Sequence, residues 1–461
     1  MEVFHFFIYR MKVAAILLLC LLGVAIAQNV CPASLLAKTP DDSIMNAIMP
    51  VKAKAFEKYR AEGQLPFATE ARAAVQCNFL GSAGEYPCEN IDLQAFVPLA
   101  NLGPANPNRE GNDIWGWTDP VTGQEIAIVG LRDGSSFVDI TNPTAPVVLA
   151  FLPTQTVSSS WRDMKVYNNY AFIVSEARDH GMQIYDLTQL RQYDGSTIVS
   201  VVPTALYTQF GSSHNIVINE ATGFAYSVGT KTCNGGLHIV DISDPLNPTC
   251  AGCYATDGYV HDAQCVVYEG PDSQHTGKEI CFCYNEDTLT IVDVSDKSNF
   301  AQLARVPYSG SQYTHQGWLS SDWTYVFLND ELDEVEGTTG GPNPANTRTL
   351  VWDVTTLANP TLLGSFYSTE TVIDHNLYVN GSLIYESNYC GGLRVLEITN
   401  SQPGSLPTLT QVGFFDVAPQ CSTTEFLGTW SNYPYFASGN IIVNSIERGL
   451  YVLKSSGFSN N

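Results

Sequence analysis

From Ile91 onward, short runs of β-branched and aromatic residues recur along the chain, and each run ends in a polar turn. The clearest examples are SSFVDITNPTAPV, MQIYDLTQL, LHIVDISDPLNPT, LTIVDVSDKSNF, LVWDVTTLANPT and LRVLEITNSQPG. A run that ends in Asp or Glu, then Ser or Thr, and often Asn-Pro or Asp-Pro, predicts a strand closed by a turn. Two further strand-like runs precede each motif and one follows it. Four antiparallel strands per repeat are typical of a β-propeller blade.

The spacing of the repeats predicts the number of blades. The equivalent positions Asp163, Asn215, Asp262, Gln316 and Asn376 are 52, 47, 54 and 60 residues apart, which is the length of a blade with variable loops. The last repeat, SNYPYFASGNIIVNSIERGLYVLK, supplies only three strands, and residues 91–99 (IDLQAFVPL) supply a lone strand before the first full repeat. We therefore expect an all-β, seven-bladed propeller over residues 91–456, closed by the strand 91–99.

The N-terminal part of the chain has a different pattern. Residues 28–90 include SIMNAIMPVKAKAFEKYRAEG and ATEARAAVQ, whose spacing of apolar residues predicts short helices on the outside of the propeller. Residues 1–27 read as upstream residues and a signal peptide, because the apolar run that starts at Met11 ends in the small-x-small pattern Ala25-Ile26-Ala27. The start codon is Met1 or Met11, and the mature chain is expected to begin at Gln28.

This leader predicts a secreted, extracellular protein. The alternative, an N-terminal membrane anchor, is disfavoured because the apolar run is short for a bilayer, and no second run of spanning length follows. Stable membrane insertion is therefore not expected.

The repeats also carry a resemblance to a known family. The segments LHIVDIS and LTIVDVS look like the LVIVD repeat, and the chain from about Cys88 to Lys454 resembles the choice-of-anchor B family of secreted proteins. The resemblance implies a propeller in an extracellular or cell-surface setting. It brings no established activity with it.

Charge and cysteine content narrow the classes of function. The chain has 46 acidic and 22 basic residues, a formal net charge of -24, which disfavours nucleic-acid binding. Of twelve cysteines, Cys20 lies in the leader, so eleven remain, and at least one of these is free or intermolecular. The pairing stays open, although structural disulfides are favoured over redox catalysis by the pair Cys250 and Cys253. Asn380 begins the N-glycosylation sequon Asn-Gly-Ser.

The start of each innermost strand holds the residues with candidate chemistry. Every repeat places a short polar residue at one position, as in Asp163 and Asn215, and a hydrogen bond to the neighbouring blade would explain this common requirement. The preceding position is more selective, because four consecutive repeats place histidine there. In chain order its residues are Asn112, Arg162, His214, His261, His315, His375 and Ser431.

These side chains are predicted to lie at one mouth of the central channel. The second strand of each blade returns to the same end and brings acidic residues with it, namely Glu176, Glu286, Asp330, Glu331, Glu386 and Glu447. One reading is a metal site in which His214, His261, His315 and His375 bind iron, copper, manganese or zinc, with glutamates as their hydrogen-bond partners. The other reading is that each histidine hydrogen-bonds within its own blade, or that the rim binds a polar ligand.

Three classes of function remain open. The first is a secreted module that binds an extracellular protein or a small-molecule ligand through one rim, with Arg162, Trp161 and Trp318 among the contact residues. The second is a metal-dependent oxidoreductase or hydrolase that uses the four histidines; its ion would be a transition metal, or calcium held by acidic loops. The third is a matrix protein cross-linked through the odd cysteine. The sequence identifies no catalytic residue.

Overall fold

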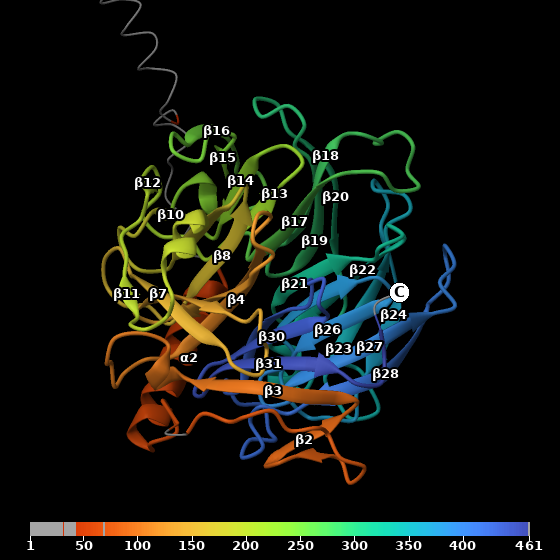
Figure 1. Ribbon diagram of the computed structural model, residues 1–461. Coiled ribbons are helices and arrows are strands. Elements are labelled where there is room, and N and C mark those ends of the chain that lie inside the picture. The colour runs from red at the N-terminus through yellow and green to blue at the C-terminus, as the bar shows by residue number, and fades with distance from the viewer. Residues whose placement is uncertain (1–30, 32–42, 68–69, 460–461) are drawn as a thin grey trace, which may run out of the picture.

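Seven sheets surround one axis in the computed structural model, which describes Cys31 and residues 43–67 and 70–459 (Figure 1). The predicted all-β, seven-bladed propeller with a short N-terminal helix is confirmed. The expected leader, including Cys20 and Gln28, lies outside the described residues. Among the described residues, no helix is long and apolar enough to cross a membrane.

Each blade is given from its innermost strand outward. The first blade consists of β4 (Gly111–Thr118), β5 (Glu125–Leu131), β6 (Gly134–Asp139) and β7 (Val147–Pro153), and the second of β8 (Arg162–Tyr167), β9 (Tyr170–Ser175), β10 (Met182–Asp186) and β12 (Ala205–Tyr207). The third blade consists of β13 (Asn215–Asn219), β14 (Phe224–Val228), β15 (Leu237–Asp241) and β16 (Thr249–Tyr254), and the fourth of β17 (Asp262–Val267), β18 (Glu279–Tyr284), β19 (Thr288–Asp293) and β20 (Ala301–Pro307). A short strand, β11 (Val199–Ser200), pairs in parallel with β7 at the edge of the first blade.

The fifth blade consists of β21 (Thr314–Leu319), β22 (Tyr325–Asp330), β23 (Arg348–Asp353) and β24 (Thr361–Tyr367). The sixth consists of β25 (Asn376–Asn380), β26 (Leu383–Ser387), β27 (Leu393–Thr399) and β28 (Thr408–Phe415). The seventh consists of β29 (Thr429–Tyr433), β30 (Asn440–Ser445), β31 (Gly449–Ser455) and β3 (Ile91–Pro98). A hairpin of β1 (Ser82–Ala83) and β2 (Tyr86–Glu89) extends the sixth sheet beyond β28. Helical segments are α2 (Met45–Ala61), α3 (Asp333–Glu336) and the 3-10 turns η2 (Leu99–Asn101), η3 (Leu187–Gln192) and η4 (Cys233–Gly235).

The recurrent Asp-x-Ser/Thr of the repeats forms the turn after the third strand of a blade. The carboxylate of Asp241 accepts a hydrogen bond from the backbone N–H of Ser243 at 2.9 Å, and Asp293 and Ser295 repeat the arrangement at 3.1 Å. The same contact follows β6, β10 and β23. A side-chain oxygen that satisfies the N–H two residues on is the Asx turn that these sequences favour.

The recurring polar residue of the innermost strands was predicted to hydrogen-bond to the neighbouring blade, and in five blades it does. The amide of Asn215 donates to the carbonyl of His261 at 3.1 Å, and that of Gln316 donates to Leu377 at 2.9 Å. Asp163, Asn376 and Asn432 also hydrogen-bond to the backbone of an adjacent blade. These bonds satisfy buried polar groups between sheets that share no strand pairing.

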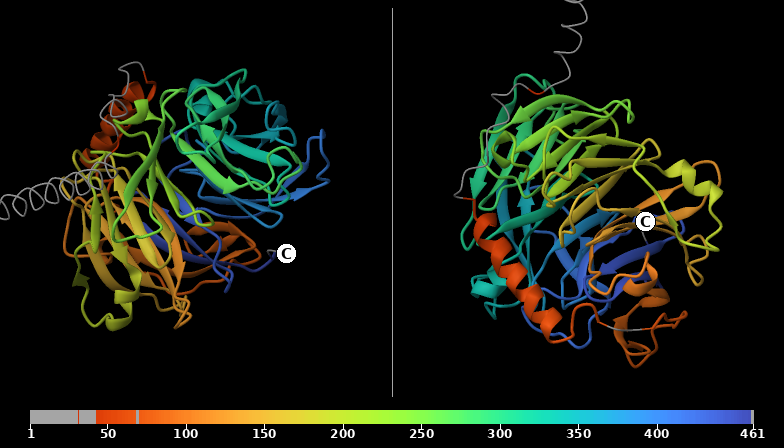
Figure 2. Two further views of the ribbon diagram at one scale, coloured as in Figure 1. Left: turned by 90° about the horizontal axis from the view of Figure 1, so that it is seen from above. Right: turned by 90° about the vertical axis from the view of Figure 1, so that its left-hand side faces the viewer.

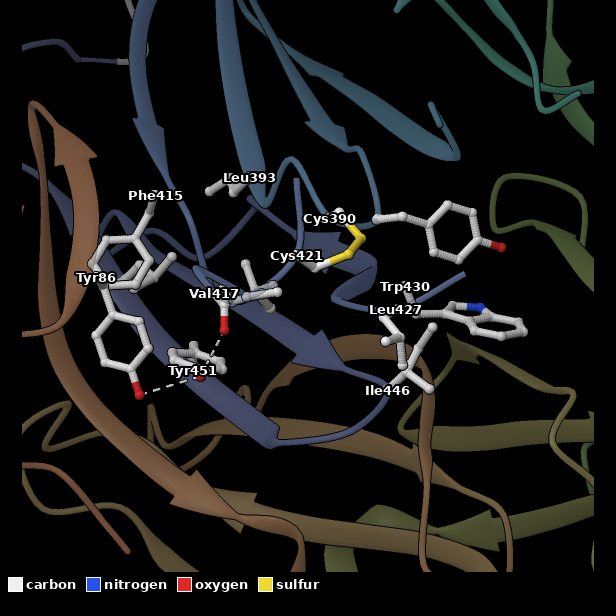
Figure 3. Packing of buried hydrophobic residues seen from close by; sticks show 14 of the residues in the cluster. Tyr86, Cys390, Leu393, Phe415, Val417, Cys421, Leu427, Trp430, Ile446 and Tyr451 are labelled. Atoms are coloured by element: carbon white, nitrogen blue, oxygen red, sulfur yellow. Dashed lines mark hydrogen bonds between the residues drawn. A yellow bond between two sulfur atoms is a disulfide. The ribbon is translucent and has the colours of Figure 1, made fainter. Parts of the chain in front are cut away.

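The ring closes where β3 pairs antiparallel with β31. Leu93 lies opposite Leu453, and Phe96 lies opposite Tyr451 with their ring centroids 4.6 Å apart. Tyr451 in turn contacts Tyr86 and Phe415 at the sixth blade (Figure 3). A strand from the start of the propeller therefore completes its last sheet and closes the ring.

The segment ATEARAAVQ is not the helix that its alanine content predicts. Within its described part, Arg72 and Val75 form antiparallel bridges to Phe96 and Leu93 on β3. The free edge of β3 offers backbone partners to this segment, and that tertiary pairing outweighs a modest helix propensity.

The helix α2 lies against one face of the ring of sheets (Figure 2). It buries Met45, Ile48, Lys52, Phe56 and Tyr59, which are spaced by three or four residues and so form one stripe facing the propeller. A helix on the outside of the propeller was expected here, and the opposite side of α2 is exposed. The buried lysine on its inner side was not expected.

Among the residues that the structure describes, ten cysteines form five disulfides. They are Cys31–Cys250, Cys77–Cys88, Cys233–Cys253, Cys265–Cys281 and Cys390–Cys421, the last of which lies beside Trp430 (Figure 3). The members of the Cys-x-x-Cys sequence thus bond to different partners. Among the described residues the free cysteine is Cys283, which is fully buried and so is not placed to cross-link two chains.

Replacing Phe96 tests the closing strand. Phe96→Ala removes a buried ring that packs on Tyr451, and we expect it to lower the free energy of unfolding by about 3–5 kcal/mol. Val121→Ala, at a position that is 76% exposed, should change it by less than about 0.5 kcal/mol. Urea unfolding followed by fluorescence measures both, and equal midpoints for Phe96→Ala and wild type would show that β3 does not hold the ring closed.

Candidate functional site

The four histidines form an arc at one mouth of the central channel. Each stands at the start of an innermost strand, in the third to sixth blades, and adjacent rings lie side by side. The ring centroids of His214 and His261 are 4.3 Å apart, those of His261 and His315 are 4.1 Å apart, and those of His315 and His375 are 4.4 Å apart. The structure therefore brings together the four histidines that the sequence singled out.

Their hydrogen bonds run between blades, not within a blade as one reading of the sequence held. The Nδ1 atoms of His261, His315 and His375 lie 2.9, 3.0 and 2.6 Å from the carbonyl oxygens of His315, His375 and Trp430. A carbonyl oxygen only accepts, so each Nδ1 carries the proton. Each neutral ring then has its lone pair on Nε2, which is the arrangement of a histidine ready to bind a metal.

The first blade shows that the inter-blade bond itself does not need histidine. At the equivalent position, the side-chain amide of Asn112 donates to the carbonyl of Ser160 at 3.3 Å. An amide N–H is sufficient for this contact. What the imidazoles add is the second nitrogen, Nε2.

All four histidines are buried. The exposed fractions of His214, His261, His315 and His375 are 5%, 1%, 1% and 2%. Burial, together with the charge of neighbouring histidines, holds the pKa values of His261 and His315 well below the usual range. Burial lowers the pKa of His375 to about 4, although the carboxylate of Glu331 opposes this shift.

Glu331 lies opposite two of these lone pairs. Its carboxylate oxygens are 3.7 Å from Nε2 of His315 and of His375, and the ligand atoms of all three residues lie within 4.8 Å of one another. Burial would raise the pKa of Glu331, but the ammonium of Lys52 and the hydroxyl of Tyr389 hold it at about 2. The site thus contains a buried, ionised carboxylate.

The cation that balances Glu331 is supplied by α2. Lys52, which is itself 2% exposed, forms an ion pair with Glu331 and lies 3.5 Å from the hydroxyl of Tyr389. Two atoms at the site nevertheless have no hydrogen-bond partner although they are buried: Nε2 of His261 and Oε2 of Glu331. Most buried polar atoms in native structures have a hydrogen-bond partner, so these two atoms are unusual.

Helix α2 also closes this mouth of the channel. At one end, the backbone N–H of Met45 donates to Glu286 at 2.7 Å, and Met45 and Ile48 pack on Tyr259 and Tyr313. At the other end, the ring centroid of Phe56 is 6.0 Å from that of Trp161, and Arg60 bonds to Glu110 before β4. The helix therefore crosses the mouth from the fourth blade to the first.

Of the other acids predicted to support the histidines, one contacts them. Glu176 lies 3.1 Å from Nδ1 of His214. Glu286 instead binds the start of α2, Glu386 accepts a hydrogen bond from Thr349 at 2.6 Å, and Glu447 accepts one from the backbone of Gly428 at 2.8 Å. Their positions at strand ends predicted that all six acids lie on one side of the ring, but packing decided which of them face the histidines.

The predicted rim residues occupy three different environments. Arg162 is buried and donates to the carbonyl of Leu131, with His180 at 3.0 Å. Trp161 is buried under Phe56, at the edge of a cavity of about 380 Å³ between α2 and the first two blades. Trp318 lies at the opposite mouth. Asn380 is half-buried in the β25–β26 turn, where its amide donates to Pro434 at 2.8 Å.

A second group with metal-ligand atoms lies elsewhere and is already engaged. Cys31, His238 and Cys250 lie close enough to share an ion, but the two sulfurs form a disulfide. The ring of His238 is held by Thr232 at 2.8 Å and Tyr207 at 2.9 Å. A disulfide offers no thiolate, so this group is structural.

The opposite mouth of the channel holds an open cavity of about 400 Å³. Residues from six blades line it, which places it on the axis. Most come from the later parts of the innermost strands or from the turns after them, although Asp262, which follows His261, also reaches its wall. Its aromatic wall is Trp115, Trp318 and Tyr378, with the centroid of Tyr378 5.1 Å from that of Trp318. Sequence reasoning identified Trp318 as a contact residue but interpreted the position of Asp262 as a structural contact between blades. It missed Lys165, whose place on an innermost strand is the signal that could have found it.

Charged groups lie at the inner end of this cavity. Nζ of Lys165 is 2.6 Å from Asp163 and 3.6 Å from Asp113, and it lies 4.6 Å from the ring centroid of Trp115. Burial and the neighbouring Asp113 hold the pKa of Asp163 well above its usual range. Burial likewise raises the pKa of Asp262, at the cavity wall, to about 7, against the opposing effect of Lys165.

Removing the ammonium from the closed mouth should destabilise the fold. Lys52→Met leaves the carboxylate of Glu331 buried without its partner, and loss of one member of such a pair costs about 3–5 kcal/mol. The control Lys54→Met, at an exposed position of the same helix, should have little effect. Urea unfolding measures both, and equal losses for the two variants would contradict the ion pair.

Asp262 should give the protein a pH-dependent stability. Its pKa rises from 3.8 to about 7 on folding, so the folded chain keeps a proton that the unfolded chain releases. The unfolding free energy should therefore fall as pH rises from about 4 to about 7.

Asp262→Asn should remove this slope. Between pH 5 and pH 8 the wild type should lose about 1–2 kcal/mol of unfolding free energy that the variant keeps. The full pKa shift would correspond to ~4 kcal/mol, but the carboxyl faces an open cavity, where solvent screening reduces the effect. Asp179→Asn, at an exposed site, serves as the control. Parallel pH profiles for Asp262→Asn and wild type would refute the shift.

Comparisons with known proteins agree with the fold. The model of the LVIVD repeat matches residues 211–256 and 281–306, which contain the third blade and most of the fourth, so one repeat corresponds to one blade. A search of the curated proteins finds no match.

Solved structures show the same architecture at low identity. The WD40 repeats of RRP9 are 9% identical, with a TM-score of 0.50, over 84% of this chain and 99% of that one. U3-55K is also 9% identical, with a TM-score of 0.50, over 79% of this chain and 98% of that one. At such identities the similarity establishes the β-propeller fold alone.

Proposed function

We propose that this chain is a secreted binding propeller of the choice-of-anchor B type, which takes its ligand in the open mouth of the central channel. The predicted leader, the five disulfides and the sequon at Asn380 support an extracellular setting. The LVIVD repeats support the family. The open cavity supports the binding role.

The observation that carries this proposal is the difference between the two mouths. The four histidines are covered by α2, whose Lys52 and Phe56 are buried against the propeller, and none of them lines the cavity of about 380 Å³ on that face. The other mouth keeps a cavity of about 400 Å³ whose wall combines aromatic rings with the polar groups of Lys165, Asp262 and Gln264. Concave sites that join apolar walls to a few polar groups are the usual form of small-molecule sites.

The wall indicates the chemistry of the ligand. Trp115 and Trp318 are half-buried, so part of each ring remains available to stack on a flat face such as that of a sugar ring. Glu220 and Glu269 also line the cavity, and the whole chain carries a net charge of -24. Acidic surroundings favour a neutral or cationic ligand over an anionic one.

The metal-dependent enzyme is less well supported as the function of the histidine mouth. Catalysis would need a substrate to touch the histidines, and all four side chains are at most 5% exposed beneath α2. Their geometry favours binding of an ion over turnover of a substrate.

Replacing Trp318 tests the binding role. A screen of neutral and amino sugars by calorimetry should identify a ligand, and Trp318→Ala should weaken its binding about tenfold or more through loss of ring stacking. Phe79→Ala, which removes a 95% exposed aromatic ring that does not line the cavity, should leave affinity unchanged. A ligand that binds both variants and wild type equally would place its site outside the cavity, against the proposal.

A further inference from the structure

A group of unused metal-ligand atoms lies beneath α2, at the end of the channel away from the proposed ligand cavity. His315 and His375 each direct a lone pair on Nε2 toward Glu331, at 3.7 Å from its carboxylate oxygens. Neither nitrogen carries a proton, because each ring donates from Nδ1 to a backbone carbonyl. Two lone pairs that face a carboxylate repel it unless a cation lies among them.

The cation next to this carboxylate is the ammonium of Lys52. It satisfies one oxygen of Glu331, while Oε2 of Glu331 and Nε2 of His261 remain buried without a hydrogen-bond partner. The ring of His261 lies beside that of His315, with centroids 4.1 Å apart. One ammonium thus leaves part of the donor set unused.

The donor set matches a transition metal better than an ammonium. Two imidazoles and one carboxylate suit divalent first-row metals such as iron and zinc. The three Nδ1–H bonds to carbonyls orient the rings in the way that partners of metal-bound histidines do. The first blade makes an equivalent inter-blade contact with Asn112, so the fold does not require the second ring nitrogen.

We infer that His315, His375 and Glu331 form a binding site for a divalent first-row transition metal, with His261 adjacent, and that Lys52 occupies the cation position until a metal displaces it. The metal and the ammonium are then alternative partners of Glu331. This site is independent of the cavity at the other mouth, so either can fail without the other.

The test uses the full secreted chain, with its disulfides intact, and Co²⁺ and Zn²⁺ as probes. Calorimetry gives the stoichiometry and affinity, and the visible absorption of bound Co²⁺ reports nitrogen and oxygen ligands. Keeping the disulfides intact prevents Cys31 and Cys250 from binding the probe as thiolates. We expect about one equivalent of metal per chain.

Asparagine substitutions separate the metal role from the structural role. In His315→Asn/His375→Asn, the amide N–H keeps a donor near the position of Nδ1, while Nε2 is lost. We expect the protein to remain folded and its metal affinity to fall at least about 100-fold, because loss of the outer hydrogen-bond partners of metal ligands alone costs about 10–100-fold. His275→Asn, in a loop outside the site, is the matched control and should bind as wild type does.

Lys52→Met tests the displacement. Methionine lacks the ammonium, so the variant should bind Co²⁺ about tenfold more tightly than wild type. The metal should therefore raise the unfolding temperature of the variant more than that of the wild type. Binding in Lys52→Met but not in wild type would support the proposal, because it shows the competition directly.

Two results would overturn the inference. One is absence of binding in both wild type and folded Lys52→Met. The other is binding that persists unchanged in His315→Asn/His375→Asn.

Discussion

The antiparallel pairing of β3 with β31 joins the beginning of the propeller to its end, and this closure determines which side chains meet. With the ring closed, the seven innermost strands all begin at one end of the channel, so the residues at their starts converge there. Closure also brings the chain that precedes β3 back to the propeller, with bridges from Arg72 and Val75 to β3. The position of α2 over the channel depends on this return.

The two mouths of the same channel differ because only one is covered. Beneath α2 the charged groups are buried, so the ammonium of Lys52 and the hydroxyl of Tyr389 keep the pKa of Glu331 low, while burial lowers the pKa of His375. At the open mouth, Lys165 is shared among several carboxyl groups, and Asp262 retains a proton to about pH 7. A closed, charge-balanced end and an open, acidic, aromatic end suit different ligands.

The histidine arc shows how a structural position can carry additional chemistry. An inter-blade contact needs one N–H donor, which Asn112 provides in the first blade and imidazole provides in the fourth to sixth. Using imidazole for that contact fixes its tautomer and leaves Nε2 facing the axis. The same hydrogen bonds that tie neighbouring blades together thus prepare the nitrogen atoms for an ion.

The sequence by itself determined the repeat, the number of blades and the gathering of His214, His261, His315 and His375, because strand periodicity and turn residues are local signals that recur in every blade. The disulfide pairs, the choice of Glu331 over Glu386 or Glu447, and the open cavity were decided by the tertiary structure. Helix α2 is the clearest case. Its apolar stripe was visible in the sequence, but whether it faced solvent or delivered Lys52 to Glu331 depended on contacts almost 280 residues apart. Local patterns carry no information about such contacts, so only the folded chain could place the lysine.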